Sequence, residues 1–423
     1  MTLTPGQAAR AIVDPLAARP AEGTPLARAL DRVLAQDIVS PLDIPAWDNS
    51  AMDGYAVRSQ DVAEGAGEAG EADRGAPVLR IIEAIAAGQF PTKALGPGDC
   101  ARIFTGAPIP DGADGVIRQE DATPLEADRV RIDDRRDAGR NVRYAGEDVR
   151  RGDVVFTAGT PLGPARLGVI ASLAQAEVFV HRRPRVAILG SGDEIAELDE
   201  RDAILAGRKI ASSNTYTLLG NLARVGAEPV NLGIARDDPA DLHQRLAQAA
   251  ATSDLVVTTA GISVGAHDHM RTVLADLGRI DFWRIGMRPG APVGYGRLGD
   301  VPWIGLPGNP VSVMVTFELF VRPAILRLLG HRAVFRRAVP VRMAEGFRVN
   351  APLTHFQRIV VSERDGGLDA RLTGPQGSGI LTSMARADGL LIVPADVDVV
   401  SEGMELSAML LDDPRLVSSP PFD

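Results

Sequence analysis

Apolar runs alternate with helical patterns between residues 183 and 330, and this is the clearest periodicity in the chain. An apolar run at 186–189 ends in Gly190-Ser191-Gly192, and apolar residues then recur at helical spacing at 218, 219, 222 and 225. Runs of the two kinds follow in turn at 230–234, 238–250, 255–259, 269–277 and 282–287. Strands that alternate with helices of this length predict a parallel sheet, and therefore an α/β domain over 183–330.

The first 48 residues show short helical patterns that prolines interrupt. Leu26, Leu30, Val33 and Leu34 have helical spacing, and prolines stand at 15, 20 and 25. A second helical pattern at 163–176 could pack against this opening. We therefore predict a discontinuous helical part made of residues 1–48 and 149–182.

Short β-like runs predict two further domains. Those at 79–82 and 116–117 lie among Gly and Pro turns and indicate a small β-rich domain over 49–148, in which 64–77 has the composition of a loop. Those at 339–343, 358–362 and 389–393 indicate a C-terminal β domain over 331–415. The apolar stretch at 311–330 contains Glu318, Arg322 and Arg327, so it predicts a buried helix and not a membrane span.

Composition argues against several classes of protein. The chain has 423 residues, 45% of them hydrophobic, which is enough for several packed cores. Acidic residues outnumber basic ones by 55 to 45, whereas nucleic-acid binders usually present a basic face. Cys100 is the single cysteine, and the six histidines have no zinc-ligand spacing. Because residues 1–10 also lack the apolar core of a secretory signal, we expect a cytoplasmic protein without a nucleic-acid or membrane partner.

Three loops follow predicted parallel strands and form the candidate site. They span 190–194, 260–268 and 306–310, and ligands of open α/β sheets bind beyond the carboxyl ends of the strands. Gly261, Ser263 and Gly265 have the composition of an oxyanion cradle, because glycine lets backbone amides approach a ligand closely. For Gly190 and Gly192 alone, a tight turn between strand and helix is an equally good explanation.

Charged residues accompany these loops. Glu194, Asp237 and Asp268 follow predicted strands, and carboxylates around a phosphate need a divalent cation, for which Mg²⁺ with oxygen ligands is the usual solution. Arg284 and Arg288 would share one side of a strand, where guanidinium groups suit an anion. Taken alone, each of these acids is more often a helix cap or a solvated residue. The two arginines are equally compatible with an edge strand in water.

Other polar motifs lie outside the α/β domain. Acids, amides and hydroxyls are framed by Gly and Pro at 45–57, 102–110 and 146–148. Unpaired groups of this kind are costly to bury, and loops of such composition often carry function. We therefore expect these three segments to contribute to a functional site.

The motifs resemble those of the molybdopterin molybdenumtransferase family, which includes bacterial MoeA and the E domain of gephyrin. The matching segments follow the family order and cover most of the chain: Asn49-Ser-Ala-Met-Asp-Gly-Tyr-Ala-Val57, Thr105-Gly-Ala-Pro108, Gly146-Glu-Asp148, Gly192-Asp-Glu194, Ser213-Asn214, Gly261-x-Ser-x-Gly265 and Leu306-Pro-Gly-Asn-Pro310. The chain departs from the family with Ala260 where Gly is usual, Ala266 where an acid is frequent, and Arg284 and Arg288 where lysines are common.

The resemblance implies an enzyme of molybdenum cofactor biosynthesis. Members of the family insert molybdate into adenylylated molybdopterin and release AMP in a reaction that depends on Mg²⁺. The resemblance also implies a homodimer with an active site shared between subunits. Each subunit would combine a helical dimerisation part, a β-rich part, a molybdopterin-binding α/β part and a C-terminal β-barrel-like part.

The resemblance also assigns roles at matching positions. Catalytic roles would fall to Asp53, Asp148, Glu194, Asp237 and Asp268, of which the last three would hold Mg²⁺. In the dimer, Asp53 and Asp148 of one subunit would face the α/β domain of the other. Substrate contacts would come from a larger set along the chain: Thr105, Gly192, Ser213, Asn214, Gly261, Ser263, Gly265, Arg284, Arg288, Pro307, Gly308, Asn309, Pro310 and Ser378.

Partners and alternatives follow from the same family. A molybdopterin adenylyltransferase would supply the substrate, and apo-molybdoenzymes or their chaperones would receive the product. Two other functions remain open at this point. A pyrophosphatase would hydrolyse nucleotide-like substrates without molybdate, and a non-catalytic pterin-binding or scaffold protein would bind without turnover.

Overall fold

The computed structural model describes residues 2–63, 75–126, 128–260, 269–349, 352–364 and 366–422. The chain forms two compact units. Unit 1 comprises Met1–Gln36, Ala158–Leu167 and Ala176–Asp423, and unit 2 comprises Asp37–Thr157 and Gly168–Gln175. The four-part division at 48/149, 182 and 330 stays a prediction.

Unit 1 begins with one helix and not with the series that the opening pattern predicts. Helix α1, Pro5–Val13, starts at a capping box in which Thr4 and Gln7 satisfy each other's backbone amides. The predicted helix around 26–34 is wrong, because only the 3₁₀ turn η1, Leu26–Arg28, forms there. Strand β1, Ala21–Pro25, pairs instead with β12, Glu177–His181, so the prolines at 20 and 25 favour extended backbone. The predicted helix at 163–176 is confirmed as α3, Pro164–Ser172.

A six-stranded sheet forms the α/β part of unit 1, in the order β16-β13-β17-β21-β20-β18. Strands β16, β13, β17 and β21 pair in parallel, whereas β20 and β18 add antiparallel strands at one edge. The bounds are Glu228–Ala235 for β16, Arg185–Ser191 for β13, Leu255–Thr259 for β17, Val301–Leu306 for β21, Gly294–Leu298 for β20 and Gly278–Phe282 for β18. The predicted strand at 282–287 is wrong, because β18 ends where that pattern begins.

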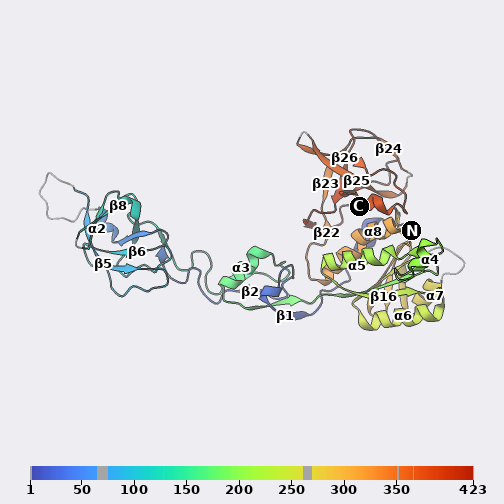
Figure 1. The fold of residues 1–423 in the computed structure, drawn as a ribbon, viewed down its shortest axis with the longest axis horizontal. Helices are drawn as coiled ribbons and strands as arrows, with labels where there is room; N and C mark the ends of the chain where they lie inside the picture. The colour runs from blue at the N-terminus through green and yellow to red at the C-terminus, as the bar shows by residue number, and fades with distance from the viewer. Residues whose placement is uncertain are drawn as a thin grey trace. The chain divides into compact units, whose positions relative to one another are not determined.

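Helices cover both faces of this sheet because β13 is apolar on both sides. Val186 and Ile188 pack with Leu218 of α5, Ser213–Val225, in one core. The alternate residues Ala187 and Leu189 pack in a second core with α6, Pro239–Thr252, and α7, His269–Leu277. Figure 1 shows α5 on one side of the sheet and α6 on the other. Continuous apolar strands of this kind are typical of parallel sheets buried on both faces.

A buried helical stretch follows β21, as the pattern at 311–330 predicts. It consists of α8, Pro310–Thr316, the π-helical segment η3, Phe317–Val321, and α9, Arg322–Leu328. Nearly all of its apolar residues lie in the same core as α5. None of the helices in the described ranges is both long enough and apolar enough to cross a membrane.

The C-terminal part of unit 1 is a small closed barrel. Its strands follow the order β19-β25-β26-β23-β29-β27, and an additional pairing of β25 with β27 closes the ring. The bounds are Met287–Arg288 for β19, Thr354–Arg364 for β25, Gly367–Leu372 for β26, Ala338–Met343 for β23, Glu405–Leu410 for β29 and Gly389–Val393 for β27. The three strands predicted for this part of the chain are confirmed.

Unit 2 contains a second six-stranded sheet, in the order β7-β4-β6-β5-β9-β8. Its core includes Tyr55, Val57, Cys100 and Ile117. The bounds are Gly115–Arg118 for β7, Gly54–Val57 for β4, Asp99–Ile103 for β6, Val78–Ile85 for β5, Arg129–Ile132 for β9 and Ala122–Leu125 for β8. The β-rich domain that the runs at 79–82 and 116–117 predict is therefore present.

Candidate functional site

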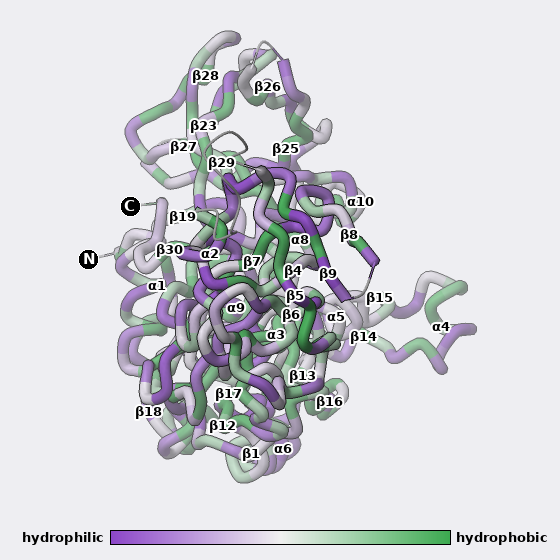
Figure 2. The backbone as a smooth tube through the Cα atoms, turned by 90° about the vertical axis from the view of Figure 1, so that its left-hand side faces the viewer, coloured by the Kyte–Doolittle hydropathy of each residue, from purple (hydrophilic) through white to green (hydrophobic). Residues whose placement is uncertain are grey.

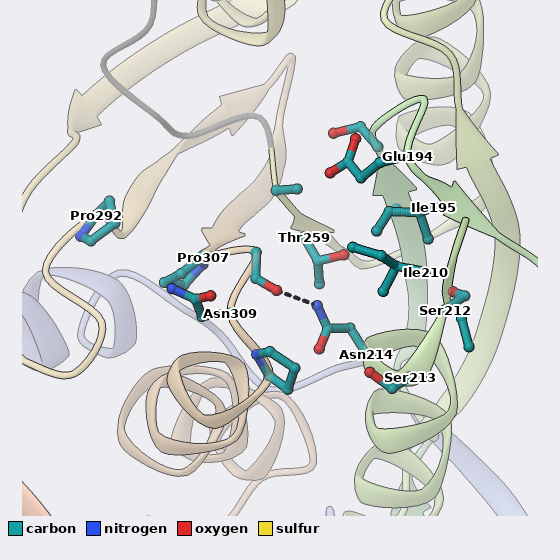
Figure 3. A pocket seen from close by; sticks show the side chains of 16 residues that line it. Glu194, Ile195, Ile210, Ser212, Ser213, Asn214, Thr259, Pro292, Pro307 and Asn309 are labelled. Carbon is teal, nitrogen blue, oxygen red and sulfur yellow. Dashed lines mark hydrogen bonds between the residues drawn. The ribbon is translucent and has the colours of Figure 1, made fainter. Parts of the chain in front are cut away.

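A cavity of about 520 Å³ opens where β13, β17 and β21 end in unit 1. Because these strands are parallel neighbours, the loops that follow them meet at one edge of the sheet. Figure 3 shows Glu194, Thr259, Pro307 and Asn309 around the cavity. The lining residues come from the three loops and from the start of α5: Gly190, Ser191, Glu194, Ile195, Ile210, Ala211, Ser212, Ser213, Asn214, Thr259, Ala260, Pro292, Pro307, Gly308, Asn309 and Pro310.

The start of α5 is tied to the loop after β21. Asn214 Nδ2 donates a hydrogen bond of 2.8 Å to the Gly308 carbonyl, drawn as a dashed line in Figure 3. This bond fixes the orientation of the amide, because only its nitrogen can donate to a carbonyl. Asn214 Oδ1 is buried and has no partner among the described residues. The amide nitrogen of Asn214 therefore positions the loop, and the substrate contact that the resemblance implies for Asn214 stays a prediction.

An apolar wall closes another side of the cavity. Ile195 and Ile210 lie on the short parallel strands β14, Ile195–Ala196, and β15, Ile210–Ala211. The segment between these strands carries α4, Arg201–Leu205, which projects away from β14 and β15 in Figure 2. Although Ile210 lines the cavity, its side chain is 61% exposed. The cavity thus combines hydroxyl and amide groups with an exposed aliphatic wall.

The predicted acids are distributed unequally around this cavity. Glu194 lines it, whereas Asp237 is exposed and is not among the lining residues. The Asp237 N–H instead lies 3.4 Å from Asp193 Oδ1. Asp268 and the predicted cradle of Gly261, Ser263 and Gly265 lie outside the described residues, as does Ala266. In the described part of the chain, no three Asp, Glu, His or Cys side chains form a group that could hold a metal ion.

Backbone geometry explains why residue 192 is a glycine. Its φ is +128°, and a Cβ atom at this position would lie 2.7 Å from Glu194 Oε2. Only glycine adopts such a conformation readily. Gly192 is not among the lining residues, and its conformation lets the chain turn toward Glu194. The substrate contact implied for Gly192 stays a prediction.

A second cavity of about 290 Å³ lies between the loop after β21 and the barrel. Arg288, His355, Gln376 and Ser378 contribute to its lining, and no carboxylate does among the described residues. Ser378 also accepts a backbone hydrogen bond from Val311 of α8 at 3.1 Å. The polar side chains of the second cavity are therefore cationic or neutral, and apolar residues such as Met287, Pro292 and Leu353 line the rest of it.

Arg358 is the most unusual residue of the second cavity. It is fully buried on β25, where Nε donates to Ser383 Oγ and Nη2 to the Gly377 carbonyl, both at 3.2 Å. No described carboxylate pairs with it, and burial lowers the pKa of Arg358 to about 10. The side chain stays protonated at neutral pH, and a buried unpaired cation is costly unless an anion joins it.

The expected pairing of Arg284 with Arg288 on one strand is wrong. Strand β19 contains only Met287 and Arg288, and Arg284 precedes it outside any strand. Arg288 lines the second cavity, whereas Arg284 lines neither cavity. The Gly-Met-Arg-Pro-Gly sequence around 286–290 breaks the extended run, because Pro289 removes a backbone donor.

Asp53 and Thr105 form a separate contact in unit 2. The Asp53 carboxylate accepts hydrogen bonds from the Thr105 backbone N–H and hydroxyl, both at 2.8 Å. These bonds lower the pKa of Asp53, and the charge of nearby Arg102 adds to the effect. Asp148 is exposed in the same unit, and its backbone N–H donates to the Ile44 carbonyl.

Sequence reasoning missed three residues that the cavities contain. Ile195 and Ile210 lie on strands of two residues each, which are too short to give a periodic signal. Arg358 carries a weak signal, because it stands directly before the apolar run Ile359-Val360-Val361 of the predicted strand. A cation at such a position is rarely fully buried without a partner.

Three family models together match most of the chain. The model for the MoeA N-terminal region (domain I and II) matches residues 4–174. The model for a probable molybdopterin binding domain matches 187–327, and that for the MoeA C-terminal region (domain IV) matches 340–411. The three models follow one another in the order expected from the motifs.

Individual proteins agree with these models. The chain is 34% identical over 385 residues to a molybdopterin molybdenumtransferase of Haemophilus influenzae, covering 89% of this chain and 91% of that protein. It is 36% identical over 390 residues to one of Nostoc sp., covering 90% and 86%. The crystal structure of a molybdopterin biosynthesis moeA protein from Pyrococcus horikoshii matches with a TM-score of 0.82 and 28% identity, over 97% of this chain and 100% of that chain. With the site at the ends of β13, β17 and β21, these matches show that the chain belongs to the MoeA family of molybdopterin molybdenumtransferases.

Proposed function

We propose that this chain is a molybdopterin molybdenumtransferase that takes adenylylated molybdopterin and molybdate as substrates and releases AMP. The family relationship supports the reaction. The single structural observation that carries the assignment of sites is the unpaired, fully buried Arg358 in the second cavity. A tetrahedral oxyanion is the partner that this cation lacks.

The larger cavity would hold the organic substrate. Its volume of about 520 Å³ is in the range of small-molecule sites. A flat ring system could lie against Ile195 and Ile210, while the amide of Asn309 on the opposite side of the cavity offers hydrogen bonds. Burial of a heteroaromatic ring between aliphatic groups and a few polar ones is the common arrangement in such sites.

The second cavity would hold molybdate. Arg358 and Arg288 supply positive charge there, and the described lining contains no acid to oppose it. Two donor atoms of Arg358 already bond to the protein, which fixes the guanidinium plane and leaves other N–H groups for an anion. Charge-assisted hydrogen bonds of this kind are stronger than neutral ones.

The described residues alone do not make a Mg²⁺ site. Glu194 and Asp237 offer oxygen ligands at the ends of β13 and β16, and Asp268 would have to complete the set from outside the described residues. When bound, Mg²⁺ would offset the charge of the phosphates. The proposed Mg²⁺ dependence rests on the family resemblance.

The family also supports a homodimer in the cytoplasm. In our proposal Asp53, Thr105 and Asp148 of one subunit serve the cavity of the other. Two observations support this. Thr105 holds the Asp53 carboxylate in place through two hydrogen bonds. Both residues belong to unit 2, whereas the cavities belong to unit 1. An adenylyltransferase would act before this enzyme, and apo-molybdoenzymes or their chaperones after it.

Calorimetric titration with molybdate tests the assignment of the second cavity. Arg358→Met should weaken binding at least about tenfold, because hydrogen bonds to charged groups contribute about 1.5–3 kcal/mol. Arg364→Met is the matched control, since Arg364 is on the same strand, has a side chain that is 71% exposed and is not in the second cavity. Equal molybdate affinity in wild type and Arg358→Met would refute the proposed anion site.

A further inference from the structure

The two cavities share three lining residues, Pro292, Pro307 and Asn309. The side chains of the two prolines contain no hydrogen-bonding group. Asn309 is therefore the one shared lining residue, among the described lining sets, whose side chain can bond to a ligand in either cavity. Figure 3 shows its amide beside Pro307.

The backbone around Asn309 is anchored on both sides. Asn214 holds the carbonyl of the preceding Gly308 at 2.8 Å. The Asn309 carbonyl accepts the first bond of α8 from the Val313 N–H at 3.0 Å. The position of the Asn309 Cα atom is thus fixed by the protein itself.

The side chain of Asn309, in contrast, is not used by the protein. Asn309 is the N-cap residue of α8, with φ −67° and ψ 128°, yet its side chain makes no capping hydrogen bond. Asparagine is among the preferred N-cap residues because its oxygen normally accepts from the first turn. Here the residue is exposed, and no described residue bonds to its amide. An anchored backbone with an uncommitted amide is suited to contact a ligand.

We propose that Asn309 contacts both bound substrates at the same time and couples their binding. This inference rests on the proposed function, which assigns the organic substrate and molybdate to the two cavities. The amide has a donor for an oxyanion on one side and an acceptor for a ring N–H on the other. A first ligand that orients this amide makes the second ligand bind more tightly, and by linkage the effect is the same in either order.

Calorimetry under anaerobic conditions measures the coupling. The probes are molybdate and molybdopterin without the adenylyl group, in EDTA, so that no phosphoanhydride can be cleaved. The Kd of molybdate is determined alone and with saturating molybdopterin, and the reverse order checks reciprocity. In the wild type we expect the second ligand to bind at least about fivefold more tightly than it binds alone.

Two variants test the role of the amide. In Asn309→Ala each single-ligand Kd should rise by about two- to tenfold, because each ligand loses one hydrogen bond, while the coupling factor falls to about one. Folding should persist because the side chain makes no cap bond. Asn309→Asp keeps the size, is also a favoured N-cap, and should weaken molybdate binding by about tenfold through like charge. Asn221→Ala is the control, since Asn221 is on α5 in the same unit but lines neither cavity.

The outcomes separate this inference from the proposed function. Wild-type coupling that survives in Asn309→Ala overturns the role of Asn309. Two ligands that bind the wild type independently also overturn it, while leaving the proposed function intact. A wild type that binds neither probe overturns both.

Discussion

Asp53 and Thr105 form a two-fold hydrogen-bonded contact in unit 2, in which one carboxylate oxygen accepts both the backbone N–H and the hydroxyl at 2.8 Å. The first residue begins the Asp-Gly turn before β4, and the second follows β6. Both segments match family motifs that lie far apart in the sequence. The contact therefore gives the Asp53 carboxylate and the Thr105 hydroxyl a shared structural role, because each is the other's hydrogen-bond partner.

The pH dependence of this contact follows from the lowered pKa of Asp53, whose ordinary value is 3.8. The backbone bond from Thr105 is the largest cause and the hydroxyl bond the next. The stabilisation is fully present above the ordinary pKa and is lost as the pH falls through the lowered pKa. Thr105→Val should raise the pKa of Asp53 only partway toward 3.8, because the backbone bond remains.

Carboxyl-carbon NMR titration of aspartate-labelled protein measures this pKa, with Asp53→Asn as the assignment control. Thr105→Ser keeps the hydroxyl and should leave the pKa near its wild-type position. If Thr105→Val leaves the Asp53 titration unchanged, the hydroxyl bond has no part in holding the carboxylate.

Gly54 has a structural reason to follow Asp53. A Cβ atom at Gly54 would lie 1.9 Å from the Ile117 carbonyl oxygen, so any side chain forces β4 away from β7. We expect Gly54→Ala to destabilise unit 2 by about 3 kcal/mol or more. Gly88→Ala is the comparison, because Gly88 has φ +81° but open space around it, and should cost only about 1–2 kcal/mol.

Hydrogen exchange with mass spectrometry locates the effect of Gly54→Ala. Peptides from β4 and β7 should lose protection, while peptides from β13 and β17 in unit 1 keep theirs. Protection of β4 equal to that in the Gly88→Ala variant would show that the sheet accommodates the added methyl group.

The α/β part could be predicted from sequence because its signal is local and strong. Strand β13 is apolar on both faces, and the helices that follow have clear periodicity. The loops at 190–194 and 306–310 lie at one sheet edge, as the sequence predicts, because parallel topology determines where strand ends lie. The helix predicted around 26–34 does not form, because pairing of β1 with β12 determines the backbone before it and overrides a short helical pattern between prolines.

The second cavity could not be predicted in this way. Arg288, Arg358 and Ser378 are separated by long stretches of sequence and meet only through packing of the barrel against the α/β part. The family resemblance predicts substrate contacts at Arg288 and Ser378. The resemblance did not single out Arg358, whose burial without a partner is visible only in three dimensions.

The backbone at Ala260 has a conformation that is strained for a residue with a side chain. Its φ is +66°, in the left-handed region that favours glycine, and the resemblance implies glycine at this position. Such a conformation costs about 1–3 kcal/mol in a residue other than glycine. Ala260→Gly removes this strain, but it also stabilises the unfolded chain by about 0.4–1 kcal/mol, because glycine gives that chain more conformational freedom. We expect a net stabilisation of about 1 kcal/mol, measured by urea unfolding, and a loss of stability would contradict the strained backbone.

Subunit mixing tests the shared site. Asp53→Asn and Glu194→Gln should each lower turnover strongly, and a mixture should regain part of the activity, because a hybrid dimer contains one site with both residues intact. Subunit exchange must first be verified by mass spectrometry. If exchanged hybrids stay as inactive as the parents, Asp53 and Glu194 serve the same subunit's site.

In the proposed reaction, AMP release depends on molybdate. The direct measurement incubates the protein with adenylylated molybdopterin and Mg²⁺, with and without molybdate, and follows AMP together with reconstitution of an apo-molybdoenzyme. We predict that AMP release requires molybdate, that it yields active molybdoenzyme, and that Arg358→Met lowers it while Arg364→Met does not. Equal AMP release without molybdate would identify a pyrophosphatase, and binding of the substrate without any AMP release would identify a scaffold protein. Either result contradicts the account.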